Sequence, residues 1–262
     1  MTIAFLSVLV AALICGTPPS LTPVIAACLA AALITAAANA VNDYFDVDID
    51  RINRPERPIP SGQVGRNEAL SFSIVFFLGA IAVALKIHGA AVLTAVFFSL
   101  LLVAYSAKFK RTVLIGNVIV SLSTAAAFIF GGLAVGSVRA AIFPALFAFL
   151  MHLSREVIKD IEDMRGDHSQ GAVTLPIRHG VKAAITVTVV LLTMLIAATI
   201  VPAALGIYGR WYLLIVAAVD AVLIGVMVKL LRQVDHNDFG KLSAVLKADM
   251  VLGLLAIYAG RW

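Results

Sequence analysis

Residues 182–204 read KAAITVTVVLLTMLIAATIVPAA, and after the first lysine they contain no charged side chain. At 1.5 Å per residue, such a run is long enough to cross the roughly 30 Å hydrocarbon core of a bilayer as a helix. Lipid offers the backbone no hydrogen-bond partner, so an isolated spanning segment must satisfy its own peptide groups, which a helix does. This stretch therefore predicts a transmembrane α-helix.

The rest of the chain has the same character. Of its 262 residues, 61% are hydrophobic and 13% are charged, whereas an average soluble domain has about 25% charged residues. The mean hydropathy is +1.02. These values exclude a soluble globule, and the continuous apolar runs lack the alternation of a membrane β-barrel. We predict an all-α polytopic membrane protein, a bundle of nine helices forming one domain over 1–262, with spans at 2–16, 21–42, 67–87, 89–106, 112–136, 139–164, 182–204, 208–231 and 242–260.

The first of these spans is short and has no basic residues before it, and no small-residue cleavage pattern follows, so we expect it to remain as a helix. Because it also lacks a polar lead-in, the true start of the protein could lie upstream of Met1. The two cysteines, Cys15 and Cys28, lie in apolar runs and offer neither metal-ligand spacing nor a disulfide framework. Small residues at 26–40 and at Gly131–Gly132 favour close helix packing in lipid.

The basic residues gather at one end of the predicted helices. Of the 20 lysines and arginines, all but Lys86, Arg139, Arg210 and Arg261 lie on the side of the loops that follow spans two, four, six and eight. The positive-inside rule assigns this side to the cytoplasm. We therefore expect a cell-membrane protein with its N-terminus inside and its C-terminus outside. The sequence pI of about 9.4 follows from this topology and requires no nucleic-acid partner.

Two acidic clusters lie on this cytoplasmic side. If the second helix continues beyond its span, Asn42, Asp43, Asp46 and Asp50 fall within an arc of about 100°, while Asp48 points away.

At the end of the sixth span, Glu156, Asp160, Asp163 and Asp167 form one narrow stripe. Carboxylates this close repel one another, and clustered oxygen ligands suit Mg²⁺, which binds a few protein carboxylates together with substrate phosphate. Two clusters suggest two ions clamping a diphosphate. The alternative is that these acids only pair with neighbouring basic residues at the membrane surface.

Basic residues between the clusters indicate phosphate binding. Prolines stiffen the loop at 54–62, where Arg54 and Arg57 could be held toward an anion, because the guanidinium group recognises phosphate oxygens in pairs. Lys108, Lys110 and Arg111 follow the fourth span; they either determine topology or also approach the phosphate.

The motif N-D-x-x-D-x-x-x-D at 42–50, followed by NRPERPIPSG at 53–62, resembles the first aspartate motif of the UbiA superfamily of intramembrane prenyltransferases. The resemblance continues through YSAKFKR at 105–111. Within the superfamily, REVIKDIED at 155–163, with Gly166, Asp167, Gly171 and TLP at 174–176, most resembles the archaeal digeranylgeranylglyceryl phosphate synthases. Chlorophyll synthases share a similar loop after the first motif, so the second motif carries this choice.

The resemblance implies a central cavity that opens sideways to lipid, with the acidic motifs capping its cytoplasmic end. It implies Mg²⁺-dependent transfer of a geranylgeranyl group from geranylgeranyl diphosphate to the free hydroxyl of geranylgeranylglyceryl phosphate, which forms the second ether bond of archaeal membrane lipids. The alternatives are an aromatic or chlorin acceptor, or a membrane carrier. Family members usually begin with a short basic segment, which this chain lacks.

Site roles follow from the same resemblance. The metal ligands expected are Asn42, Asp46, Asp50, Glu156, Asp160 and Asp163, and the substrate-binding residues expected are Arg54, Arg57, Lys108, Lys110, Arg111 and Asn117. Asp43 or Asp167 would accept the hydroxyl proton. Tyr105 would orient a phosphate or stabilise a cation with its ring. For Asn117, an interhelical hydrogen bond is an alternative to lining the cavity.

Overall fold

The computed structural model describes residues 2–17, 20–169, 171–232, 235 and 238–261, and the regular structure in these residues is entirely helical. Eight helices are long and apolar enough to cross a membrane, and the 14-residue α1 is a shorter apolar helix. The all-α polytopic prediction is confirmed, with eight long spans plus a short one. The helices are α1 (Thr2–Cys15), α2 (Thr22–Asn53), α3 (Arg66–Ala84), α4 (Gly89–Ala107), α5 (Ile115–Ala134), α6 (Ile142–Glu162), α7 (Met164–Ser169), α8 (Leu175–His179), α9 (Val181–Ala204), α10 (Arg210–Leu231) and α11 (Asp238–Ala259).

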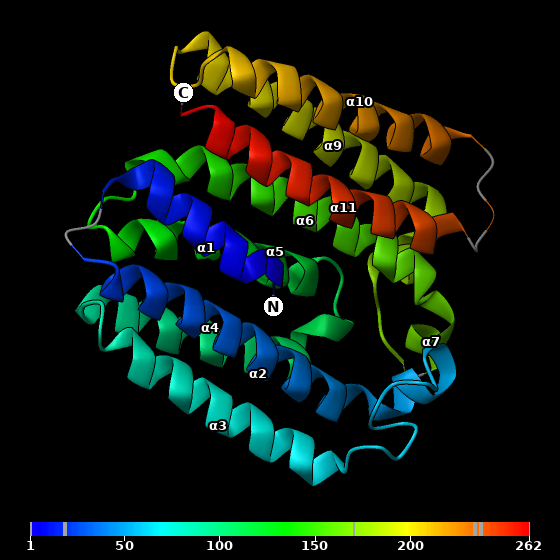
Figure 1. Cartoon of the computed structure of the whole chain (residues 1–262). Coiled ribbons are helices and arrows are strands. Elements are labelled where there is room, and N and C mark those ends of the chain that lie inside the picture. The colour runs from blue at the N-terminus through cyan, green and yellow to red at the C-terminus, as the bar shows by residue number, and fades with distance from the viewer. Residues whose placement is uncertain (1, 18–19, 170, 233–234, 236–237, 262) are drawn as a thin grey trace.

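The helices run side by side as a bundle (Figure 1). α2, α3 and α4 form one flank, α9 and α10 form the other, and α1, α5, α6 and α11 lie between them. Large apolar side chains remain exposed on both flanks, among them Phe72, Val75 and Leu78 on α3 and Leu213 and Leu214 on α10. A soluble protein rarely leaves so much apolar surface uncovered. This surface is the part that faces lipid, as expected for a multi-pass membrane protein.

α1 packs against α2, α5 and α11. Its contact with α5 depends on Gly131, where an added Cβ would collide with the carbonyl oxygen of Val8 and lie 2.7 Å from the Ala11 Cβ. Small residues let helices approach closely in lipid, where van der Waals packing is the main attraction. The close packing expected at Gly131 is confirmed.

α2 is the longest helix, with 32 residues. At 1.5 Å per residue it measures about 48 Å, which exceeds the thickness of the bilayer core. Its first part crosses the membrane, and its last three turns carry the first acidic motif. The helix therefore does continue through Asp50, as the shared acidic face required.

The second acidic motif is not one continuous helix. α6 ends at Glu162, Asp163 has non-helical angles (φ −87°, ψ 1°), and the short α7 begins at Met164. The prediction of a continuous helix from Glu156 to Asp167 is therefore wrong at Asp163, although all four acidic residues of the predicted stripe line one cavity. Backbone hydrogen bonds continue on both sides of the break: the Asp163 amide donates to the Lys159 carbonyl, and the Asp167 amide donates to the Asp163 carbonyl. It turns α7 toward α2, with which α7 packs (Figure 1).

Candidate active site

A cavity of about 430 Å³ lies inside the bundle, at the level where the two acidic motifs face each other. Its inner part is lined by apolar side chains, including Ile34, Phe98, Leu102, Val120 and Phe130. Its outer part is lined by charged and amide side chains: Asn42, Asp50, Arg54, Arg57, Lys110, Asn117, His152, Arg155, Glu156, Lys159, Asp160, Asp163 and Asp167. The cavity is therefore amphipathic, with a polar end that can hold an anionic headgroup and an apolar end that can hold a hydrocarbon chain.

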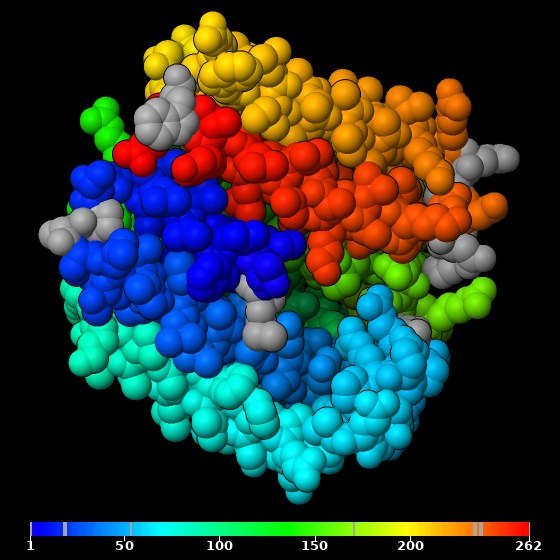
Figure 2. Space-filling view, in the orientation of Figure 1, coloured from blue at the N-terminus to red at the C-terminus, as the bar shows by residue number. Residues whose placement is uncertain are grey.

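The side wall of the cavity includes Ile3 and Ala4 at the start of α1 and Lys247 and Met250 on α11. Figure 2 looks onto this face, and deeper helices are visible between α2 and α11. The cavity is thus approached from the flank of the bundle as well as from its polar end.

The first motif places two nearly buried carboxylates beside cations. Asp46 is 2% exposed and Asp50 is 5% exposed. Asn42 Nδ2 donates to Asp46 Oδ2 at 2.6 Å, and Lys110 forms a short ion pair with the same oxygen. Arg57 bridges Asp50 at 2.7 Å and Asp43 at 3.1 Å.

Local structure explains how the two cations reach α2. Arg57 lies in a series of turns in which the Arg57 amide donates to the Arg54 carbonyl and the Val64 amide to the Pro58 carbonyl. Lys110 lies in a short turn that presses against the start of α5. A Cβ at Gly116 would come within 2.6 Å of the Phe109 carbonyl oxygen, so only glycine permits this approach.

The electrostatics follow from these pairs. Burial lowers the pKa of Lys110, but the nearby carboxylates of Asp46, Asp167 and Asp50 together outweigh burial, and the net pKa is raised. The pKa of Arg57 is raised in the same way by Asp50. Burial raises the pKa of Asp167 to about 6, although Lys110 opposes the shift. Both cations therefore stay charged near neutral pH, while Asp167 is close enough to titration to exchange a proton.

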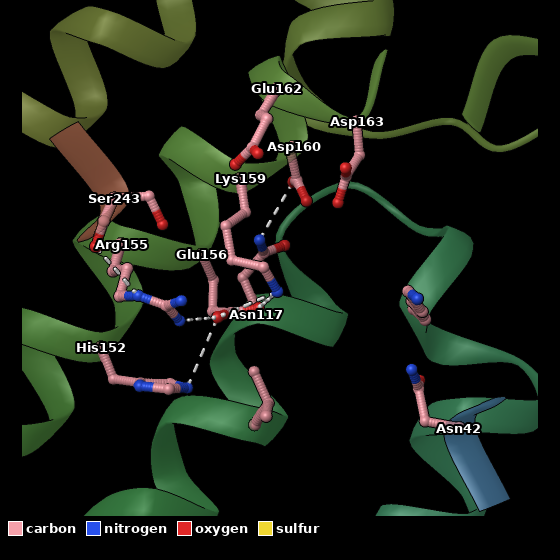
Figure 3. A network of polar contacts seen from close by, with 12 residues as sticks. Asn42, Asn117, His152, Arg155, Glu156, Lys159, Asp160, Glu162, Asp163 and Ser243 are labelled. Carbon is pink, nitrogen blue, oxygen red and sulfur yellow. Dashed lines mark hydrogen bonds and ion pairs between the residues drawn. The ribbon is translucent and has the colours of Figure 1, made fainter. Parts of the chain in front are cut away.

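The second motif forms the opposite wall (Figure 3). Asn117 Nδ2 donates to Asp160 Oδ2 at 3.0 Å, and Arg54 reaches Asp163 at 3.2 Å. Arg54 thereby links the end of α2 to the end of α6. Asn117 both lines the cavity and makes an interhelical hydrogen bond, so the two alternatives for this residue hold together.

Glu156 has different surroundings. Its carboxylate lies 3.0 Å from Arg155 Nη1, 3.2 Å from Lys159 Nζ and 3.6 Å from His152 Nε2. The residue is 7% exposed. Glu156 is thus enclosed by nitrogen atoms on its own helix, an arrangement that Asp46, Asp50 and Asp160 do not share in the described part of the chain.

Only some of the remaining predicted site residues line the cavity. Tyr105 and Asp167 line the cavity. Asp43 and Asp46 are not among the lining residues: Asp43 is a partner of Arg57, and Asp46 lies behind the wall as a partner of Lys110. Lys108 and Arg111 are exposed and lie outside the cavity wall.

Sequence reasoning gave no binding role to three cations that the structure brings to the cavity, namely Arg155, Lys159 and Lys247. The spacing of Arg155 and Lys159 around Glu156 was the available signal. Lys247 gave none, because its place in the cavity depends on how α11 packs against α6.

Part of the site fits a magnesium ion chemically. In the described ranges, no three acidic, histidine or cysteine side chains converge closely enough to hold a metal by themselves. The donors available are oxygen atoms, which Mg²⁺ prefers, and few protein ligands are needed when substrate phosphate and water complete the shell. Asn42 Oδ1 is buried and has no hydrogen-bond partner among the described residues. An oxygen left unsatisfied beside Asp46 is consistent with a ligand position for a cation.

Comparison with known proteins agrees with the geometry. The family model for the UbiA prenyltransferase family matches residues 4–245. The digeranylgeranylglyceryl phosphate synthase of Methanothermobacter thermautotrophicus is 40% identical over 228 residues, which cover 86% of this chain and 80% of that protein.

Two solved structures share the fold. One, from work on digeranylgeranylglyceryl phosphate synthase in membranes, has a TM-score of 0.80 at 33% identity and covers 98% of this chain and 92% of its own. The other, a UbiA homologue from Archaeoglobus fulgidus bound to GPP and Mg²⁺, has a TM-score of 0.68 at 21% identity and covers 98% and 96%. Because the family model matches residues 4–245 and the Methanothermobacter protein is 40% identical, the chain belongs to the UbiA prenyltransferase family.

Proposed function

We propose that this protein transfers a geranylgeranyl group from geranylgeranyl diphosphate to the free hydroxyl of geranylgeranylglyceryl phosphate. The observation that carries the proposal is the amphipathic cavity, whose charged end joins two acidic motifs and whose apolar end can hold an isoprenoid chain. The similarity to a digeranylgeranylglyceryl phosphate synthase over most of the chain supports the acceptor.

The reaction breaks the bond between C1 of the prenyl chain and the bridging oxygen of the diphosphate, which leaves with the electron pair. The acceptor hydroxyl oxygen then forms the new ether bond to C1 and loses its proton to a base. Negative charge grows on the diphosphate as it departs, so cations that contact its oxygens lower the barrier. Arg57, Lys110 and Arg54 are the side chains we assign to this task, with charges already held at the polar end of the cavity.

Magnesium, when bound, would neutralise the diphosphate and so stabilise it as a leaving group. We assign its protein ligands to Asn42, Asp46 and Asp50 on one wall and Asp160 and Asp163 on the other. Asp46, Asp50 and Asp163 now pair with cations, Asp160 accepts a hydrogen bond from Asn117, and Asn42 donates one to Asp46. With metal and substrate bound, the acidic groups would turn to the metal and the basic groups to phosphate. Because Glu156 is enclosed by nitrogen atoms, we assign it a different role below.

The other expected residues fit this scheme in part. Asp167 lines the cavity and has a pKa of about 6, which suits a base that accepts a proton near neutral pH. It is the better candidate, because Asp43 is paired with Arg57. Tyr105 lines the cavity, and its ring would shield a developing allylic cation from water. Lys108 and Arg111 are assigned to the membrane surface instead.

The whole chain, 1–262, would then act as a single transmembrane domain. The excess of basic residues at the motif end supports a cytoplasmic location for the active site, with α1 starting on that side and the C-terminus outside. A water-soluble diphosphate would reach the polar end from the cytoplasm, and the lipid acceptor would enter from the membrane.

The test is product formation by purified protein in nanodiscs, with geranylgeranyl diphosphate, Mg²⁺ and either geranylgeranylglyceryl phosphate or 4-hydroxybenzoate as acceptor. We expect the diether phosphate, detected by mass spectrometry, and its loss when EDTA removes the metal. Transfer only to the aromatic acceptor would overturn the acceptor assignment. No transfer to either compound would favour a carrier.

A further inference from the structure

A second group of cations lines the cavity at the seam between α6 and α11. It consists of Arg155, Lys159 and Lys247, which we call the α6–α11 cations. Arg155 Nε donates to the Ser243 carbonyl of α11 at 3.3 Å, which ties the two helices together (Figure 3). Lys247 lies four residues beyond Ser243, and side chains four apart share one face of a helix. The three cations therefore belong to one wall of the cavity.

The α6–α11 cations carry more positive charge than their partner can balance. Glu156 is the carboxylate that pairs with Arg155 and Lys159. In the described part of the chain, no carboxylate pairs with Lys247, although this residue lines the cavity. Asp160, one turn from Glu156, also lines the cavity, but it accepts a hydrogen bond from Asn117 and forms no ion pair with these cations among the described residues. Counted by ion pairs alone, three cations share one carboxylate, which is an excess of two positive charges.

The ion-paired groups at the end of α2 and at the end of α6, which we call the acidic wall, have the reverse balance. Arg54, Arg57 and Lys110 are paired there with five carboxylates, so negative charges exceed positive ones by two. The five carboxylates are those of Asp43, Asp46, Asp50, Glu162 and Asp163. An acidic wall can receive a diphosphate only together with cations from solution. The basic wall can receive an anion directly, since charged donors bind phosphate oxygens strongly. The cavity therefore offers two chemically different anion sites.

The proposed reaction requires two anionic groups in the cavity at once, the diphosphate of the donor and the phosphate of the acceptor. We propose that the α6–α11 cations bind the acceptor phosphate, while the acidic wall receives the donor. Glu156 is then the counter-ion that holds Arg155 and Lys159 in place when the site is empty. This inference rests on the proposed function and adds the residues that select a phosphorylated acceptor.

The surroundings of Lys247 suit the glycerol and the hydrocarbon chain of the acceptor lipid. Met250, one turn along α11, lines both the main cavity and a second cavity of about 70 Å³. The second cavity is mostly apolar and shares Ile3, Ser7 and Thr124 with the first. A phosphate held at Lys247 thus places the hydrocarbon chain beside an apolar space. His152 Nδ1 is buried nearby without a hydrogen-bond partner among the described residues, and it can meet a glycerol oxygen.

The experiment compares Lys159→Gln and Lys247→Gln with a matched control, Lys241→Gln. Lys241 lies on α11 and is exposed like Lys247, but it pairs with Asp238 and is not part of the cavity lining. Binding is measured in nanodiscs of zwitterionic lipid with three probes: geranylgeranylglyceryl phosphate, the same compound without its phosphate, and geranylgeranyl diphosphate with Mg²⁺. The KM for each substrate is measured in parallel.

We expect each cavity variant to weaken binding of the phosphorylated acceptor about tenfold or more, the usual effect of losing a hydrogen bond to a charged group. Binding of the phosphate-free compound and of the donor should not change, and the control should behave as wild type. Among the described residues Lys247 has no ion-pair partner to lose, so its variant should fold normally.

Two results would overturn the inference. One is unchanged acceptor affinity in both cavity variants; the other is an equal loss for donor and acceptor, which would make these cations part of the diphosphate site. Either result could be obtained with an enzyme that still forms the diether product, so the proposed function would stand. If wild-type protein makes no diether and does not distinguish the phosphorylated acceptor from the phosphate-free compound, the proposed function fails together with the inference.

Discussion

The most informative perturbation is Asp46→Asn, which removes one charge and almost no volume. Asp46 is 2% exposed and contacts Asn42 and Lys110. In the proposed reaction it holds a cation against the departing diphosphate. Removing one electrostatic stabiliser of a growing negative charge typically lowers kcat about 10²–10³-fold, or roughly 3–4 kcal/mol. We expect a loss of at least this size, with geranylgeranyl transfer followed by mass spectrometry.

The same substitution also affects folding, and the two effects must be separated. Breaking a fully buried ion pair costs about 3–5 kcal/mol, and because the Lys110 side chain is 28% exposed to solvent, we expect a smaller loss of about 2 kcal/mol. Adding Lys110→Met removes the unpaired ammonium. The double variant should recover most of the thermal stability in nanodiscs and remain inactive.

Asp48→Asn is the matched control. Asp48 lies two residues further along the same helix, its side chain is 63% exposed, and its ion pair with Arg51 is on the surface. Exposed pairs of this kind contribute little to stability, so activity and melting temperature should match wild type. If Asp46→Asn kept wild-type activity and Mg²⁺ dependence, the assignment of the first motif would be refuted.

Three further predictions concern other parts of the chain. Glu156→Gln should leave the Mg²⁺ concentration for half-maximal activity unchanged, whereas Asp160→Asn should raise it about 10–100-fold; a rise in both variants would return Glu156 to the metal ligands. The raised pKa of Asp167, about 6, means that its carboxylate is present at neutral pH and is protonated as pH falls through 6. The rate should therefore decline below pH 6, and the residual activity of Asp167→Asn should lack that decline; an identical profile would exclude Asp167 as the base. Gly131→Ala should lower the melting temperature, at a cost of about 1–3 kcal/mol, because α1 must move away from α5. Gly253→Ala, in a helix with no atom within 4 Å of the added Cβ, should stabilise slightly, and equal effects of the two would contradict the packing described here.

The acidic face on α2 could be predicted from the sequence because it depends only on helical periodicity. Asn42, Asp43, Asp46 and Asp50 needed nothing beyond a continuing helix, and the structure supplies it. The break at Asp163 could not be predicted in this way, since it arises where α7 turns to pack against α2. Periodicity assumes a regular helix and carries no information about tertiary contacts.

The hydrogen-bond and ion-pair partners of the acidic residues could not be predicted from the sequence either. Lys110 is 64 positions from Asp46, and Asn117 is 43 positions from Asp160. Their meeting depends on the packing of α5 against its neighbours and on the approach that Gly116 permits. For the same reason, Lys247 could be counted as a topology determinant but not recognised as a cavity residue.

The flank of the cavity bordered by Ile3, Ala4, Lys247 and Met250 has a kinetic consequence. In the proposed reaction, a product with two C20 chains would leave through this side into the bilayer, and the acceptor would arrive the same way. The relevant concentration is then molecules per unit area of membrane. Diluting the acceptor with inert lipid should slow turnover even when its amount per volume of buffer is fixed, and the rate should follow the acceptor's mole fraction in the bilayer.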